Sequence, residues 1–210
     1  MKRLAIIGAS GHGKVVAELA ELCGFKVVFY DDAYPHKKNI EHWLVVGKFA
    51  CLLTANDKDQ DAIVAIGDNK IRLNLSEQLM ASGFRLPVLI HPCAVISKYA
   101  TVDSGTVVFA NAVINAFSQV GKSCIINTAA VVEHDCKLGD AVHLSPNVAL
   151  AGGTRINRLS WLGIGSVTKQ LIEVGSNVSI GANSTVIKNI PDNVTAFGSP
   201  AEVINNKHSK

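Results

Sequence analysis

The stretch VVEHDCKLGDAVHLSPNVALAGG, residues 131–153, decides the fold of this chain of 210 residues. An aliphatic residue recurs at every sixth position, at Val132, Leu138, Leu144 and Leu150. A helix repeats every 3.6 residues and a strand every two, so neither selects every sixth position. The period indicates hexapeptide repeats of a β-helix, in which each repeat supplies one short strand and a corner.

The same period runs over some ninety residues, and only Thr168 interrupts it. Its aliphatic members are Ile96, Val102, Val108, Ile114, Val120, Ile126, Val132, Leu138, Leu144, Leu150, Ile156, Leu162, Val174, Ile180 and Val186. Small residues such as Ala112, Ser118 and Ala130 stand two positions before most of them. We therefore expect a solenoid over 91–204 whose stacked coils bury the aliphatic ladder, followed by a polar tail at 205–210.

Residues 1–90 follow a different pattern, in which strand-like and helix-like segments alternate. The strands are expected at 3–8, 26–32, 61–68 and 85–90, and the helices at 13–25 and 69–83. The segment 35–60 is less regular, with a short helix within GKFACLLTAN (47–56). Alternating strands and helices predict a parallel sheet in a Rossmann-like α/β domain.

The composition excludes several classes of protein. Hydrophobic residues make up 48% and charged residues 18%, which argues against disorder. A net charge of +3 without a basic run gives no sign of nucleic-acid binding. Five scattered cysteines without a CxxC pair indicate reduced thiols, a cytoplasmic protein and no metal site. The apolar run at the start reads as a buried strand, and no stretch approaches the roughly 18 residues that span a membrane.

One imidazole interrupts the ladder, because His134 stands between Glu133 and Asp135. Val132 points into the coil, so the three polar residues should fall at an outward corner. A coil of three hexapeptides advances 18 residues, which makes Ala116 and Gly152 the stacked neighbours of His134. A histidine near neutral pKa can accept a proton, and a neighbouring carboxylate can orient it. The spacing alone does not choose between the two carboxylates.

A glycine-rich loop, GASGHG at 8–13, follows the first strand and opens a helix. The backbone N–H groups at a helix N-terminus can hold a phosphate. The order is G-x-x-G-x-G, and Asp31 lies about twenty residues further on, so these residues alone leave NAD open as a ligand.

The motifs together resemble a known family. The ladder, the GSPA ending and EHD are similar to the hexapeptide acyltransferases. IIGASGHGKVVAE, YDD, AIGDNKIR, LIHPCAVIS and NTAAVVEHDCKLGD, which appear in that order, resemble the bacterial nucleotide-amino-sugar N-acetyltransferases and their sialic-acid O-acetyltransferase relatives. The resemblance implies a small α/β domain followed by a left-handed parallel β-helix, assembled as a homotrimer with active sites between subunits.

The resemblance also implies roles for individual residues. His134 would be the general base and Asp135 its partner, and Asn127 would lie near the acceptor amine. His143, Ile164 and Ala182 would contact acetyl-CoA, the acetyl donor. A nucleotide sugar, in place of NAD, would bind at Ser10, Gly11, His12, Asp31, Asp32 and Gly67.

We therefore expect an acetyl-CoA-dependent N-acetyltransferase that acts on a UDP-linked 4-amino-4,6-dideoxy sugar in bacterial glycan or glycoprotein synthesis. An O-acetyltransferase for sialic acid or a related sugar is the nearest alternative. A non-catalytic β-helix scaffold, whose front domain senses a dinucleotide, is an alternative of another class.

Overall fold

The computed structural model describes residues 2–54 and 61–204. The predicted polar tail at 205–210 therefore lies outside the described residues. The chain divides into two compact units, residues 1–92 and 93–210.

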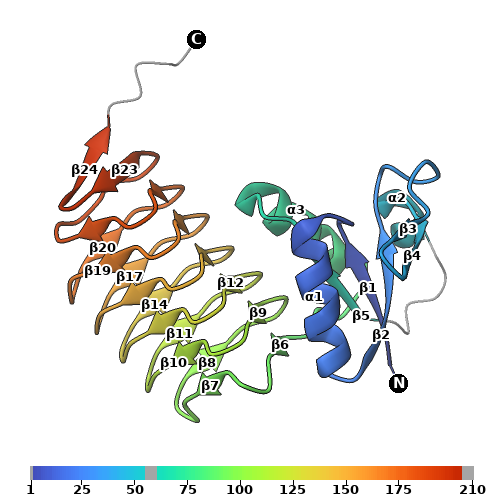
Figure 1. Ribbon diagram of the computed structural model, residues 1–210, viewed down its shortest axis with the longest axis horizontal. Coiled ribbons are helices and arrows are strands. Elements are labelled where there is room, and N and C mark those ends of the chain that lie inside the picture. The colour runs from blue at the N-terminus through green and yellow to red at the C-terminus, as the bar shows by residue number, and fades with distance from the viewer. Residues whose placement is uncertain (1, 55–60, 205–210) are drawn as a thin grey trace. The chain divides into compact units, whose positions relative to one another are not determined.

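The first unit is an α/β domain built on a five-stranded sheet of order β3-β4-β2-β1-β5 (Figure 1). The strands are β1 (Lys2–Ile7), β2 (Phe25–Tyr30), β3 (Asn39–Ile40), β4 (Trp43–Gly47) and β5 (Asp61–Val64). All neighbouring pairs are parallel except β3 with β4. The helices are α1 (Gly11–Leu22), α2 (Phe49–Thr54) and α3 (Asn69–Ala81). In a parallel sheet the carboxyl ends of the strands share one edge, where ligands of such domains bind.

One predicted strand is wrong. Residues 85–90 contain only the two-residue β6 (Leu89–Ile90) and add no strand to this sheet. The fourth parallel strand is β4, from the segment whose pattern was less regular. Pro87 lacks the backbone donor that an inner strand needs, whereas Trp43–Gly47 alternates between exposed and buried side chains.

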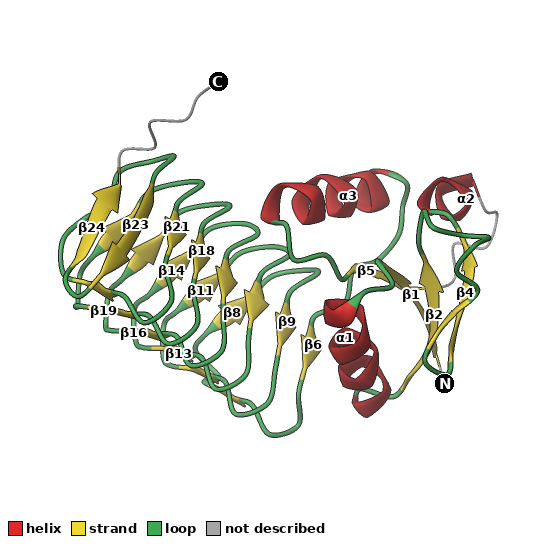
Figure 2. Ribbon diagram, turned by 45° about the horizontal axis from the view of Figure 1, so that its top comes forward, coloured by secondary structure: helices red, strands yellow, loops and turns green. Residues whose placement is uncertain are grey.

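The second unit is a parallel β-helix of two-residue strands (Figure 2). Its strands are β7 (Val95–Ile96), β8 (Thr101–Val102), β9 (Val107–Val108), β10 (Val113–Ile114), β11 (Gln119–Val120), β12 (Ile125–Ile126), β13 (Val131–Val132), β14 (Lys137–Leu138), β15 (His143–Leu144), β16 (Ala149–Leu150), β17 (Arg155–Ile156), β18 (Trp161–Leu162), β19 (Val167–Thr168), β20 (Glu173–Val174), β21 (Ser179–Ile180) and β22 (Thr185–Val186). Each strand from β7 to β19 pairs with the strand 18 residues later, as β10 does with β13, whereas β21 pairs with β23 at an offset of 16 residues. An antiparallel hairpin of β23 (Thr195–Gly198) and β24 (Ala201–Ile204) follows the last coil.

The ladder fills the interior as the period predicts. Val132, Leu144 and Ile156 are fully buried, and so are the small residues Ala112, Ser118 and Ala130. Thr168, the one polar member, is buried with its hydroxyl 3.0 Å from that of Thr154 and accepts a hydrogen bond from the N–H of Ala151. A polar residue is therefore accommodated without breaking the stack.

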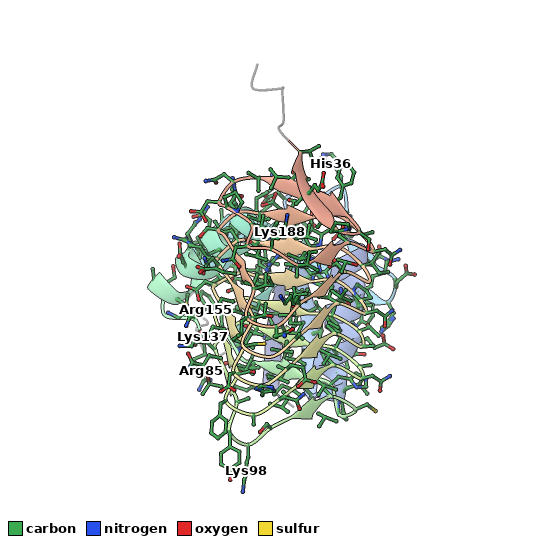
Figure 3. The ribbon with its side chains drawn as sticks, turned by 90° about the vertical axis from the view of Figure 1, so that its left-hand side faces the viewer. His36, Arg85, Lys98, Lys137, Arg155 and Lys188 are labelled. Carbon is green, nitrogen blue, oxygen red and sulfur yellow. The ribbon has the colours of Figure 1, made fainter. Side chains whose placement is uncertain are left out.

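The three outer faces differ in chemistry. The valine face, on β7, β10, β13, β16, β19 and β22, carries Val95, Val113, Val131, Ala149, Val167 and Thr185. The charged face, on β8, β11, β14, β17 and β20, carries Thr101, Gln119, Lys137, Arg155 and Glu173. Lys137 and Arg155 lie one coil apart there (Figure 3). The third face presents Val107, Ile125, His143, Trp161 and Ser179.

Corners recur with the same period of six, and the second residue of most of these turns has a left-handed backbone. These positions include Asn111, Phe117, Ser123, Ala129, Asp135, Ala141, Asn147, Gly153, Leu159, Gly165, Leu171, Asn177 and Asn183. We call the turns at 98–99, 116–117, 134–135, 152–153 and 170–171 the His134 corner, which lies between the valine and charged faces. The turns at 110–111, 128–129, 146–147, 164–165 and 182–183 form the groove corner, between the third and valine faces.

Candidate active site

His134 and Asp135 are the two central residues of one corner turn. The φ angle of Asp135 is 61°, a left-handed conformation that Asp tolerates better than most residues. The N–H of Asp135 donates to the carbonyl of Ala116 at 3.1 Å, and the carbonyl of His134 accepts from the N–H of Gly153 at 2.9 Å. The neighbouring coils therefore fix the backbone of this turn from both sides.

The two side chains form a hydrogen-bonded pair, with His134 Nδ1 and Asp135 Oδ2 2.8 Å apart. The carboxylate of Glu133 instead accepts from the backbone N–H of His134, at 3.4 Å. A proton on Nδ1 that is donated to the carboxylate leaves a lone pair on Nε2, the state that a general base needs. Both side chains are more than 60% exposed, so this pair is accessible to an acceptor.

Gly152 makes room for the imidazole. A Cβ atom at residue 152 would lie 2.6 Å from His134 Nε2 and 2.7 Å from its Cε1. The ring therefore covers the backbone of Gly152, and only glycine leaves space for it there.

The thiol nearest to His134 along the chain is poorly suited to carry an acyl group. Cys136 is buried, and its Sγ donates to the carbonyl of Ala151 at 3.4 Å. Burial raises the pKa of the Cys136 thiol to about 11, which keeps it protonated at neutral pH.

A groove of about 390 Å³ lies along the groove corner and the third face. Its lining includes Ser145, Trp161, Gly163, Ile164 and Ala182, and it is mostly apolar. Both Ile164 and Ala182, expected to contact acetyl-CoA, therefore line one continuous hollow.

His143 stands beside this groove with its ring stacked on that of Trp161, at 5.7 Å between centroids and 14° between planes. Trp161 Nε1 donates to the hydroxyl of Ser145 at 2.7 Å. Sequence reasoning missed Trp161 and Ser145. The 18-residue coil would have found Trp161, since it follows His143 by one coil.

The structure separates the two halves of the expected acetyl-transfer site within one chain. His134 and Asp135 lie on one edge of the valine face, whereas Ile164 and Ala182 belong to the groove corner at its other edge, and Asn127 immediately precedes a turn of that corner. One face corresponds to about six residues of extended chain, or roughly 20 Å. Asn127 also turns its Oδ1 back to the N–H of Thr128, at 2.9 Å.

The glycine-rich loop of the first unit leads from β1 into α1, with Ser10 as the residue before the first helical turn. The Ser10 side chain makes no capping hydrogen bond. Asp31, after β2, accepts from the N–H groups of Ala9 at 2.7 Å and Ala33 at 2.9 Å. Lys37 Nζ donates to the carbonyl of Ala9. Asp31 Oδ2 thus supports the loop, whereas its Oδ1 stabilises the turn that follows β2. Asp32 beside it is exposed.

The glycines of this region divide into two kinds. A Cβ at Gly13 would lie 2.3 Å from the carbonyl oxygen of Gly8, so Gly13 serves close packing. A Cβ at Gly11 or Gly67 would meet nothing within 4 Å, so these two residues border open space. A hollow of about 200 Å³ near the loop is lined by Gly8, Tyr30, Asp31, Asp32, Phe49 and neighbouring apolar residues.

His12 differs from the exposed loop residues in its electrostatics. Burial, with a smaller contribution from the charge of Arg72, lowers the pKa of His12 from 6.5 to about 4, so the ring is neutral at pH 7. Arg72 is itself buried and donates to the carbonyls of Ile66 at 2.9 Å and Gly67 at 3.0 Å. This guanidinium fixes the backbone of the segment that follows β5, at Ile66 and Gly67.

Within residues 2–54 and 61–204, no cluster of three or more His, Cys, Asp or Glu residues could hold a metal ion. In the same ranges, no helix is long and apolar enough to cross a membrane.

Comparison with known proteins places these features in one family. Residues 3–79 match the family model of the PglD N-terminal domain. The acetyltransferase domain of PglB from Neisseria gonorrhoeae FA1090, solved with acetyl coenzyme A, is 44% identical over 97% of this chain and 99% of that chain, with a TM-score of 0.93.

Two further relatives match over nearly their whole lengths. PerB from Caulobacter crescentus, solved with CoA and GDP-perosamine, is 37% identical over 98% of each chain, with a TM-score of 0.92. GDP-perosamine N-acetyltransferase of Escherichia coli O157:H7 is 28% identical over 96% of each chain. These matches confirm the expected fold class, an α/β domain followed by a left-handed parallel β-helix. The chain belongs to the nucleotide-amino-sugar N-acetyltransferases of the hexapeptide-repeat type.

Proposed function

We propose that this protein transfers the acetyl group of acetyl-CoA to the 4-amino group of a UDP-linked 4-amino-4,6-dideoxy sugar, with His134 as general base. The observation that carries this proposal is the 2.8 Å contact between His134 Nδ1 and Asp135 Oδ2. Among the described residues no hydrogen bond to His134 Nε2 is found, and that nitrogen lies over the clearance left by Gly152.

The reaction proceeds by direct attack in a ternary complex. The neutral amine attacks the thioester carbonyl, a C–N bond forms, and the C–S bond breaks to release the CoA thiol. His134 Nε2 accepts the proton that the amine loses, and Asp135 stabilises the resulting imidazolium. The imidazolium then returns this proton to the departing sulfur, which gives the free thiol and restores the base. The buried, protonated state of Cys136 supports this route over an acyl-cysteine intermediate.

Acetyl-CoA occupies the groove that Ser145, Trp161, Ile164 and Ala182 line. A mostly apolar groove suits the pantetheine arm, and His143, stacked on Trp161, stands where a polar group can contact the donor. The solved relative from N. gonorrhoeae, which was crystallised with acetyl coenzyme A, supports this donor.

The nucleotide diphosphate binds at the start of α1. Ser10 immediately precedes a 12-residue helix that Gly11 and His12 begin, and Gly11 and Gly67 border open space. Asp32 is exposed beside the hollow and can accept hydrogen bonds from the base or the ribose, while Asp31 supports the loop. One relative is named for a GDP sugar and another for a UDP sugar, so the acceptor panel below includes both nucleotides.

A homotrimer completes the site. The exposed fraction of Val95 is 62% and that of Val167 is 37%, and an apolar face of this kind favours burial against another subunit. The His134 corner and the groove corner are the two edges of that face. A three-fold axis parallel to the coil stack would set the His134 corner of one subunit beside the groove corner of the next. Base and donor groove, separated within one chain, would then share one site.

The test is a thiol-release assay with acetyl-CoA and a panel of acceptors: UDP- and GDP-linked 4-amino sugars, the corresponding hydroxy sugars, and sialic acids. We expect turnover with a UDP-linked 4-amino-4,6-dideoxy sugar and a loss of about 10²–10⁴-fold in kcat for His134→Ala. Asp135→Asn should lose less, and Glu133→Gln less again.

Several outcomes contradict the proposal. Turnover only with hydroxy sugars or sialic acids would make the protein an O-acetyltransferase, and near-wild-type kcat in His134→Ala would remove histidine from the mechanism. Sedimentation that finds a fully active monomer would refute the shared site.

A further inference from the structure

Two aromatic side chains are exposed on the same corner as His134. The rings of Tyr99 and Phe117 stack with centroids 5.3 Å apart and 21° between planes, although 56% and 60% of these residues are exposed. Lys98 Nζ lies 4.9 Å from the Tyr99 ring centroid, and Lys98 projects away from the ribbon in Figure 3. Contiguous exposed apolar surface is a feature of ligand-binding sites.

The backbone of Phe117 makes its presence less expected. Its φ angle is 63°, in the left-handed region where bulky side chains are unfavourable, and most equivalent turn positions hold Asn, Gly or small residues. The large apolar exceptions are Phe117, Leu159 and Leu171. Two of these three, Phe117 and Leu171, lie on the His134 corner.

Phe117 and Leu171 lie on opposite sides of the catalytic pair along this corner. Phe117 is one coil before Asp135, whose N–H donates to the carbonyl of Ala116. Leu171 is one coil after Gly153, and its Cδ2 would lie 2.7 Å from a Cβ at that glycine. The His134 turn therefore has an aromatic wall one coil before it and an aliphatic wall two coils after it.

The donor groove indicates which wall faces the acceptor. Its lining residues run from Ser145 to Thr195, so the groove lies on coils that come after the His134 turn in the stack. In an assembly whose axis is parallel to the stack, equal coils lie at equal heights. The donor then approaches from the Leu171 side, and the Phe117 side is left for the acceptor.

We infer that Phe117, supported by Tyr99, is the platform on which the acceptor sugar places its apolar face, and that it selects for a 6-deoxy sugar. This inference rests on the proposed function. A 6-deoxy pyranose presents C–H groups and a methyl group, which favour contact with an aromatic face, whereas a C6 hydroxyl favours water. Two coils, each about 4.8 Å high, separate Asp135 from Tyr99. That span fits a pyranose ring with its 4-amino group at His134 and its anomeric carbon directed toward Tyr99.

The experiment compares Phe117→Ala with Leu159→Ala in the full-length protein. Leu159 is a matched control, because it has the same kind of backbone, with φ 64°, on the corner between the charged and third faces. Each variant is assayed with a nucleotide-linked 4-amino-4,6-dideoxy sugar and with its counterpart that carries a C6 hydroxyl. Sedimentation reports the oligomeric state.

We expect Phe117→Ala to lower kcat/KM about 10-fold for the 6-deoxy acceptor, to reduce its preference over the C6-hydroxy acceptor, and to leave the KM for acetyl-CoA unchanged. Phe117→Tyr should restore most of the activity, and Leu159→Ala should match the wild type.

An active wild type whose acceptor kinetics are unchanged in Phe117→Ala would overturn the platform alone. Dissociation of the oligomer in this variant would show instead that Phe117 serves a subunit interface, which also overturns it. A wild type that acetylates no nucleotide-linked amino sugar would refute the proposed function itself.

Discussion

Gly152→Ala should impair catalysis while leaving the fold intact. The new Cβ would lie 2.6 Å from His134 Nε2, whereas ordinary contacts begin near 3.4 Å, so the imidazole must move by about 0.8 Å. The backbone of Gly152 has no left-handed φ, which means that alanine fits its conformation. Because His134 is 63% exposed, the ring can swing toward solvent and the free energy of unfolding should change by less than about 1 kcal/mol.

Displacement of a base by nearly 1 Å costs about 10- to 100-fold in rate, which corresponds to about 1.4–2.7 kcal/mol of transition-state stabilisation. The assay is the thiol-release kcat of four proteins: wild type, Gly152→Ala, His134→Ala and the double variant. If alanine acts through the imidazole, it should have little further effect once His134 is removed.

Two results would refute this reasoning. One is a Gly152→Ala enzyme with the kcat of the wild type. The other is an equal loss from Gly152→Ala in the presence and absence of His134, which would show that the methyl group obstructs a substrate directly.

Three further predictions concern other parts of the chain. Gly11→Val should raise the KM for the nucleotide sugar at least about 10-fold and leave the KM for acetyl-CoA unchanged, because the valine side chain enters the open space before α1. Equal effects on both KM values would contradict the proposal that the glycine-rich loop binds the nucleotide diphosphate. His12→Gln should remove an acid sensitivity of the first unit. In the wild type, the unfolded chain binds a proton below pH 6.5 that folded His12 accepts only near pH 4, so the free energy of unfolding should fall by up to about 3 kcal/mol between these pH values. Urea unfolding of proteins that carry Trp161→Phe, followed by the fluorescence of Trp43, measures the difference, with His36→Gln at an exposed histidine as the control. Cys136→Ala should keep kcat within about 3-fold, and the trapping of an acetyl group on Cys136 would contradict direct transfer.

The β-helix could be predicted in detail because its stability depends on one repeated choice. Each coil buries an aliphatic residue at a fixed position, so residues such as Val132 and Leu150 report the register directly. The same 18-residue arithmetic gave Ala116 and Gly152 as the stacked neighbours of His134, as the structure has them. Local pattern was sufficient because each coil of a solenoid contacts only its neighbouring coils.

The first unit was less predictable, because its sheet depends on contacts that are distant in sequence. The segment 85–90 has an apolar composition typical of a strand, but Trp43–Gly47 occupies the place beside β2. The role of Asp31 was also hidden, since the loop that its carboxylate supports lies 22 residues earlier in the chain. Phe117 and Trp161 went unnoticed because a ladder pattern describes the inward residues and leaves the outward ones unconstrained.

The left-handed turn at Asp135 has a consequence for how such a site can arise. Asn occupies the equivalent place in several other turns, among them Asn111, Asn147 and Asn177, because its short polar side chain tolerates this backbone. Asp shares that tolerance, and a single base change converts an Asn codon into an Asp codon. A corner of this scaffold can therefore gain a carboxylate beside an existing histidine by one substitution that the backbone of the turn already tolerates.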